Sequence, residues 1–171
     1  MKTSGLLFCV LTVFAGPSVS AQTSASASGT LTVDGKSFKL TRVRAQERPN
    51  PFDDSKRIIR VVLSDVPVSD NAMSSRDSLE DLILGDKLHA IEFTFTPDGE
   101  TFGGELYYNM MSYIFQAGTF DFEKKTFNSK TVSGKVSAKE EGKSAEMHFK
   151  VAATFTVQVE QQVSRSGKEK N

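Results

Sequence analysis

The stretch from Met147 to Val159 constrains the fold of this chain more than any other. Its apolar and polar residues alternate without interruption, and the apolar set is Met147, Phe149, Val151, Ala153, Phe155, Val157 and Val159. Successive side chains of a β-strand point to opposite faces, so this spacing predicts a strand with one buried face. At about 3.3 Å per residue the strand would be about 43 Å long, roughly twice the usual length. We therefore expect it to bend and to serve two parts of a curved sheet.

The first 21 residues have the pattern of a signal peptide. Lys2 is positively charged, residues 5–16 are almost entirely apolar, and residues 19–21 offer small or modest side chains at the cleavage position. The lone cysteine, Cys9, lies inside this segment, so the mature chain would have no disulfide. A membrane helix needs about 18 or more consecutive apolar residues, and no later stretch has that many. The sequence predicts an exported protein, periplasmic or secreted, that does not span a membrane.

Length and charge suit one domain without a nucleic-acid partner. The chain has 21 basic and 21 acidic residues, whereas nucleic acids favour a basic groove. Residues 22–28, mostly Ser and Ala, are interpreted as a flexible leader, residues 29–163 as a single β domain, and the charged residues 164–171 as a disordered tail.

Turn signals divide the chain into short strands. Asp34-Gly35 predicts a tight hairpin because both residues tolerate positive φ. Pro97-Asp98-Gly99 predicts a second hairpin, and Gly103-Gly104 predicts a bulge or bend in its second arm. The nearly continuous apolar run of residues 57–64 predicts a central strand that is covered on both faces. Residues 112–122 and 125–138 are expected to form two further strands, joined by a turn at Glu123-Lys124.

Two segments interrupt the strands. Residues 45–55 contain Pro49, Pro51 and several polar residues, so we expect a long surface loop with Phe52 tucked against the end of the β structure. Residues 69–75 are interpreted as a polar linker. Residues 78–84 predict a short helix that ends at Gly85 and plugs an open end of the β structure.

The pattern as a whole predicts an all-β fold. We expect an antiparallel meander that closes as a curled barrel or folds as a two-sheet sandwich, with one short helix at about residues 78–84. The glycines at positions 103, 104, 118 and 134 favour a strongly curved sheet.

Three segments carry a resemblance. They are Gly-Thr-Leu-Thr-Val-Asp-Gly-Lys at residues 29–36, Val-Leu-Ser-Asp at residues 62–65, and Ser-Gly-Lys-Val at residues 133–136 ahead of the long last strand. Together they resemble an uncharacterised group of exported bacterial all-β proteins to which no activity is assigned. The resemblance implies export and an all-β fold, and it brings no catalytic residue.

The sequence predicts no catalytic, cofactor-binding or metal-binding residue. His89 and His148 lie in no metal-ligand spacing. A single inward histidine such as His89 is more typical of a hydrogen-bonded core residue than of a ligand or base. The adjacent carboxylates Asp53-Asp54 and Glu80-Asp81 are more typical of solvated charge than of a catalytic pair.

One cluster favours recognition. All three tyrosines and two methionines fall within seven residues, and the candidate binding residues are Tyr107, Tyr108, Asn109, Met110, Met111 and Tyr113. Aromatic and methionine side chains offer large contact area and adaptable shape, although the same cluster could instead cover the end of the core. Charge is also uneven, since residues 34–60 are mainly basic and residues 65–105 mainly acidic. These segments either pair across neighbouring strands or attract a charged partner.

Three functions remain open. The first is an exported binding or interaction module whose partner is an unknown envelope or extracellular protein. The second is a carrier of a small apolar ligand, which needs a closed barrel with aromatic side chains around a cavity. The third is an enzyme, which would depend on His89 and scattered carboxylates.

Cleavage after Ala21 is directly testable. The mass of the exported protein should correspond to a chain that begins at Gln22, cyclised or not, and that carries no lipid. A mature mass that retains Cys9 would contradict the predicted signal peptide.

Overall fold

The computed structural model describes residues 25–50, 52–74, 76–138, 142–144 and 147–161. In chain order, the helices and strands are β1 (Ser26–Val33), β2 (Lys36–Leu40), β3 (Arg42–Asn50), β4 (Asp53–Ser64), α1 (Asp70–Ser74), α2 (Arg76–Leu84), β5 (Ala90–Phe95), β6 (Thr101–Tyr108), β7 (Met111–Gln116), β8 (Phe120–Phe127), β9 (Thr131–Ala138), β10 (Gly142–Ser144) and β11 (Met147–Gln161). The all-β fold with a curled sheet is therefore confirmed. The strand order runs β2-β1-β11-β3-β4-β5-β6-β7, while β9 and β10 also pair with β11 and β8 pairs with β9. This path has two ends, so the sheet is not closed.

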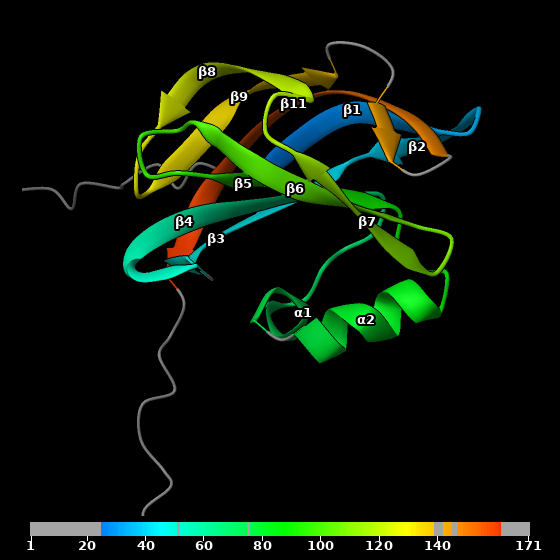
Figure 1. Ribbon diagram of the computed structural model, residues 1–171, viewed down its shortest axis with the longest axis horizontal. Coiled ribbons are helices and arrows are strands. Elements are labelled where there is room, and N and C mark those ends of the chain that lie inside the picture. Colours follow the sequence, from blue (N-terminus) through cyan, green and yellow to red (C-terminus); the bar gives the residue numbers. More distant parts are fainter. Residues whose placement is uncertain (1–24, 51, 75, 139–141, 145–146, 162–171) are drawn as a thin grey trace, which may run out of the picture.

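The sheet folds over into two layers (Figure 1). The first layer contains β1, β2, β8, β9, β10 and most of β11, and the second contains β3 to β7. Aromatic rings meet between the layers, with centroids 5.0 Å apart for Phe93 and Phe120 and 4.7 Å apart for Phe95 and Phe122. The main core therefore lies between the layers. A smaller core lies between the second layer and the two helices on its outer face.

β11 joins the two layers, as its length predicts. Residues 149–156 pair with β1 and residues 152–158 pair with β9, both antiparallel. The last three residues then pair in parallel with residues 45–47 of β3, in the other layer. The alternating apolar side chains of β11 from Met147 to Val157 are buried, as predicted. The parallel pair is the departure from a purely antiparallel meander.

Several local predictions are confirmed. Asp34 and Gly35 have φ angles of 46° and 78°, which is the hairpin conformation expected for this pair. The register shifts beside Thr94 in the pairing of β5 with β6, opposite the predicted bulge. β4 is central, between β3 and β5, and residues 58–64 are buried on both faces.

Two boundaries differ from the sequence prediction. β1 begins at Ser26, so residues 26–28 of the expected leader belong to the sheet. The expected loop at residues 45–55 is largely strand, because β3 continues to Asn50 and β4 begins at Asp53. Pro49 is tolerated there since the pairing of β3 with β11 ends before it, and no strand among the described residues needs its missing N–H on that side.

Residues 111–138 contain three strands, β7, β8 and β9, where two were expected. The turn between β7 and β8 includes Gly118, whose φ of 92° favours glycine. The turn between β8 and β9 is closed by Asn128, whose side chain accepts two backbone N–H groups. Glu123 and Lys124, expected at a turn, lie within β8.

The predicted helix is present as α2, which ends just before Gly85. The expected linker contains a second helix, α1, whose first turn is capped by the hydroxyl of Ser69 accepting from the N–H of Ala72. Both helices cover the outer face of the second layer and do not plug an open end (Figure 1). Neither helix, nor any other in the described part of the chain, has the length and apolar character needed to cross a membrane.

The two faces of β11 should differ in their contribution to stability. Phe155 is 2% exposed and stacks on Phe122. Phe155→Ala should lower the free energy of unfolding by about 3 to 5 kcal/mol, because burial is lost and a cavity forms. Thr156→Ala, on the other face, should change it by no more than about 0.5 kcal/mol. Urea melts measure both, and equal losses would contradict the assignment of the faces.

Candidate functional site

Strand alternation places a row of polar side chains on the outer face of the second layer. Directly paired residues share a face of a sheet, and the register pairs Gln46 with Arg60, Val62 with Glu92, and Glu92 with Glu105. The helices pack on Val62 and on its apolar neighbours in β5 and β6. Charged side chains therefore lie beside and partly beneath the helices.

A buried ion pair lies at the centre of this face. Nη2 of Arg60 is 2.7 Å from Oε2 of Glu92, and the two side chains are only 6% and 4% exposed. Nη1 of Arg60 donates to the backbone oxygen of Met73, 3.0 Å away, which ties α1 to β4. Burial alone would lower the pKa of Arg60, but the Glu92 carboxylate outweighs it and raises that pKa. Removing one partner would leave an uncompensated buried charge, at a cost of about 3 to 5 kcal/mol.

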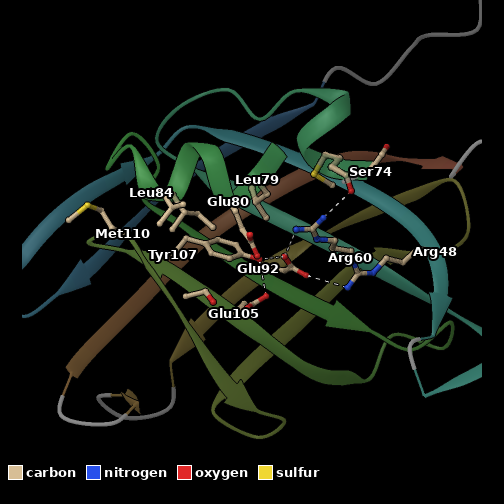
Figure 2. Close-up of a pocket in the computed structure, with 13 residues that line it drawn as sticks. Arg48, Arg60, Ser74, Leu79, Glu80, Leu84, Glu92, Glu105, Tyr107 and Met110 are labelled. Carbon is tan, nitrogen blue, oxygen red and sulfur yellow. Dashed lines mark hydrogen bonds and ion pairs between the residues drawn. The ribbon is translucent and has the colours of Figure 1, made fainter. Parts of the chain in front are cut away.

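The hydroxyl of Tyr107 lies between two carboxylates (Figure 2). It donates to Oε2 of Glu92 at 2.6 Å and also lies 3.0 Å from Oε2 of Glu105. Like charges directly opposite each other destabilise a sheet, and a donor between them offsets that effect. Burial, reinforced by the charge of Glu92, raises the pKa of Tyr107, so the phenol remains a neutral donor.

Arg48 shares the carboxylate that Arg60 already holds. Its Nη2 is 3.9 Å from Oε1 of Glu92, and its side chain is 35% exposed. Burial lowers the pKa of Arg48, Glu92 partly offsets this, and the positive charge of Arg60 adds to the lowering. Among the described residues, the Nε–H groups of Arg48 and Arg60 have no acceptor and Oε1 of Gln46 has no donor. The face therefore holds polar groups with unused hydrogen-bonding capacity.

Two hollows open along this face, and we call them together the outer groove. The first, of about 290 Å³, lies beside α2, where Leu84, Tyr107 and Met110 contribute to its lining (Figure 2). The second, of about 370 Å³, is lined by apolar side chains that include Phe52, Phe102 and Ile114. Arg48, Glu92 and Glu105 line both hollows. The outer groove thus has one charged centre shared by two hollows, of which the second is the more apolar. Each hollow is near the lower size limit of small-molecule sites.

Exposed apolar side chains gather around the outer groove. Large apolar side chains exposed in the described part of the chain are Phe52, Leu84, Phe102, Met110, Met111 and Ile114. All of these except Met111 line one of the two hollows. Phe52 was expected to tuck in, but it is 82% exposed, and its ring lies 6.1 Å from that of Phe102. The bulge in β6 explains the exposure of Phe102, because the register shift takes it out of phase with the buried Leu106.

The predicted binding residues do not form one surface. Their positions were Tyr107, Tyr108, Asn109, Met110, Met111 and Tyr113. Tyr107 is buried beneath the helices, whereas Tyr108 and Tyr113 pack, partly buried, against the core between the layers. Asn109 and Met110 form the turn between β6 and β7, with φ angles of 52° and 60°. Asn109 is exposed, and Met110 and Met111 are 51% and 55% exposed. The structure brings Tyr107 and Met110 alone of these six into the outer groove.

His89 lies away from this groove and is hydrogen-bonded, as expected. Its Nδ1 is 2.7 Å from Oδ2 of Asp65, and its ring stacks on Phe38 with centroids 3.9 Å apart. The Asp65 contact attaches the start of β5 to the end of β4, and the Phe38 contact attaches it to β2. Among the described residues, no group of three or more His, Cys, Asp or Glu side chains could hold a metal ion.

The sequence prediction missed the charged residues of the outer groove. Two signals pointed to them: Arg60 interrupts the apolar run of residues 57–64, and Glu92 lies between Ile91 and Phe93. The uneven charge of residues 34–60 and 65–105 was a third signal. Pairing across neighbouring elements explains part of this uneven charge, because arginines of β3 and β4 bind Glu92 and Asp70.

Tyr107→Phe should lower the free energy of unfolding at neutral pH by about 1 to 3 kcal/mol, because Glu92 loses a buried donor. The variant should also respond less to alkali. The raised pKa means that the folded wild type keeps its phenolic proton above about pH 10, where the unfolded chain loses it. Wild-type stability should therefore fall as the pH rises above about 10, and the variant should lack this component. Urea melts across this pH range measure both effects.

Tyr113→Phe is the matched control, because the Tyr113 hydroxyl is exposed and its hydrogen bond within the described part of the chain is a weak one to Sδ of Met111, at 3.5 Å. Its stability should stay within about 0.5 kcal/mol of wild type. If the two variants behaved alike, the Tyr107 hydroxyl would have no special role in the network.

Comparison with known proteins gives no match. No family model, curated protein or solved structure matches the chain.

Proposed function

We propose that this chain is an exported binding protein, periplasmic or secreted, and that the outer groove is its binding surface. The proposal depends on one observation: charged side chains and exposed apolar side chains lie next to each other in the outer groove. Arg48, Glu92 and Glu105 line both hollows, and Phe52 and Ile114 are 82% and 75% exposed beside them. Export is supported by the signal-peptide pattern of residues 1–21, which lies outside the described residues.

The construction of the groove favours recognition. Its polar groups project from neighbouring strands of a packed sheet, and the Arg60–Glu92 pair holds them in place. A site on rigid strands loses little conformational freedom on binding, so less of the free energy of its contacts is offset by the cost of ordering. Exposed apolar side chains that gather in one place mark binding surfaces more often than scattered ones do.

The ligand-carrier alternative is favoured by the second hollow. A carrier was expected to hold its ligand inside a closed barrel, but the sheet is open and phenylalanine rings meet between its layers. The second hollow, in contrast, has a mostly apolar lining and a volume of about 370 Å³. A small ligand would therefore bind on the outer face.

An amphipathic fluorescent probe tests the groove. Phe52→Ser combined with Ile114→Ser should weaken binding of 1-anilinonaphthalene-8-sulfonate about fivefold or more, because both side chains line the second hollow. The melting temperature should hardly change, since both side chains are mostly exposed. Met111→Ser is the control, because Met111 is exposed but lies outside both linings. Equal probe affinity in the three proteins would exclude the groove as the binding surface.

A further inference from the structure

The floor of the second hollow has a gap where a strand side chain is missing. Thr94 pairs with Gly103, and Gly103 pairs with Gln116, across β5, β6 and β7, and all three residues line this hollow. Directly paired residues share a face of a sheet, so the three positions form one row on the outer face. Glycine within a strand often marks a place where a ligand approaches the backbone closely. The gap at Gly103 therefore lies between two polar side chains.

Thr94 provides an unused hydrogen-bonding group at this floor. The residue is only 8% exposed, and its hydroxyl has no hydrogen-bond partner in the described part of the chain. Among the described side chains, the fully enclosed polar atoms that lack a hydrogen bond belong to Arg44, Gln46, Arg48 and Arg60. The Thr94 hydroxyl is not one of them, so a ligand can reach it from the hollow that Thr94 lines.

Aromatic rings contribute the exposed wall of the same hollow. Phe52 and Phe102 both line it, and they are 82% and 42% exposed. Their ring centroids lie 6.1 Å apart, and the ring planes are tilted by 42°. Aromatic rings attract one another beyond the effect of their burial, so a planar aromatic ligand gains more here than a saturated ligand of similar size.

The charged side chains of this hollow already have partners inside the protein. Arg48 is 3.9 Å from Glu92, which also forms the close pair with Arg60. Glu105 lies 3.0 Å from the hydroxyl of Tyr107. A charged ligand would lose its hydration without finding an unpaired charge to compensate it. The second hollow therefore favours a neutral ligand.

We propose that the second hollow binds a small neutral aromatic molecule that carries a hydroxyl group, of the phenol or naphthol class. This inference rests on the proposed function, because the second hollow is part of the outer groove. The aromatic ring lies over Gly103 against Phe52 and Phe102, and the ligand hydroxyl bonds to that of Thr94. Hydroxyl groups both donate and accept, so the two match in either direction. A volume of about 370 Å³ suits a ligand of about one or two rings.

Four ligands of similar shape test the hydroxyl, the aromatic ring and the absence of charge. At neutral pH, wild type should bind 2-naphthol about fivefold more tightly than 2-methylnaphthalene, which lacks the hydroxyl. Decahydro-2-naphthol keeps the hydroxyl but not the aromatic rings, and it should bind about threefold or more weakly than 2-naphthol. The anion 2-naphthoate should bind most weakly. Fluorescence titration of 2-naphthol, and its displacement by the other three ligands, measure these affinities.

Variants of the lining locate the ligand. Thr94→Val should reduce the affinity for 2-naphthol to that for 2-methylnaphthalene, and the melting temperature should hardly change because no internal hydrogen bond is lost. Thr154→Val is the matched control, since Thr154 is exposed on β11 and lines neither hollow. Leu84→Ser with Met110→Ser alters only the first hollow and should leave 2-naphthol binding unchanged.

The outcomes separate this inference from the proposed function. Equal binding of 2-naphthol and any of the other three ligands, or no effect of Thr94→Val, would overturn the inference. Loss of 2-naphthol binding in the first-hollow variant would overturn it as well. The outer groove would remain the binding surface in each case if Phe52→Ser with Ile114→Ser still weakens binding of the fluorescent probe. Failure of all four ligands and of the probe would overturn both proposals. If Thr94→Val does not fold, the ligand comparison still decides, because it uses wild type alone.

Discussion

The architecture depends on one strand that belongs to both layers. β11 pairs with β1 and β9 in the first layer, and residues 159–161 continue into parallel pairing with β3 in the second. Because a single backbone crosses between them, the layers cannot slide apart without breaking its hydrogen bonds or bending it further. The phenylalanine contacts between the layers depend on this fixed relation. A strand of ordinary length could not reach both layers.

The Arg60–Glu92 pair has a comparable role on the outer face. It binds α1 through Met73, holds the carboxylate that Tyr107 and Arg48 also approach, and forms the centre of the outer groove. Replacing such a pair by apolar residues is often neutral for stability, so burial of these charges is weak evidence of a stabilising role. The pair does give α1 a directional contact that apolar packing alone would not supply. The Arg60–Glu92 pair therefore both positions α1 and provides charged side chains to the outer groove.

Local alternation predicted the core but could not predict what covers the polar side of a strand. Phe155 and the rest of its face follow directly from the period of two. The same period predicts Glu92 to face solvent, and the structure buries it because helices from earlier in the chain lie over that face. Adjacent residues of a strand point to opposite faces, so Tyr107 and Tyr108 could not both have belonged to one surface. Applying that rule to the tyrosine cluster would have assigned Tyr107 and Tyr108 to opposite faces of the sheet.

The pairing of the first strand with the last one has a kinetic consequence. Residues 26–33 have β2 as a local partner, but their other edge is completed by residues 149–156, from the opposite end of the chain. Contacts between such distant segments require a large loop to close and make folding slow. The sheet cannot be completed until β11 has been synthesised, so a growing chain remains open for most of its synthesis. The order of strand pairing therefore leaves the edge of β1 that faces β11 without its partner until almost the whole chain has been made.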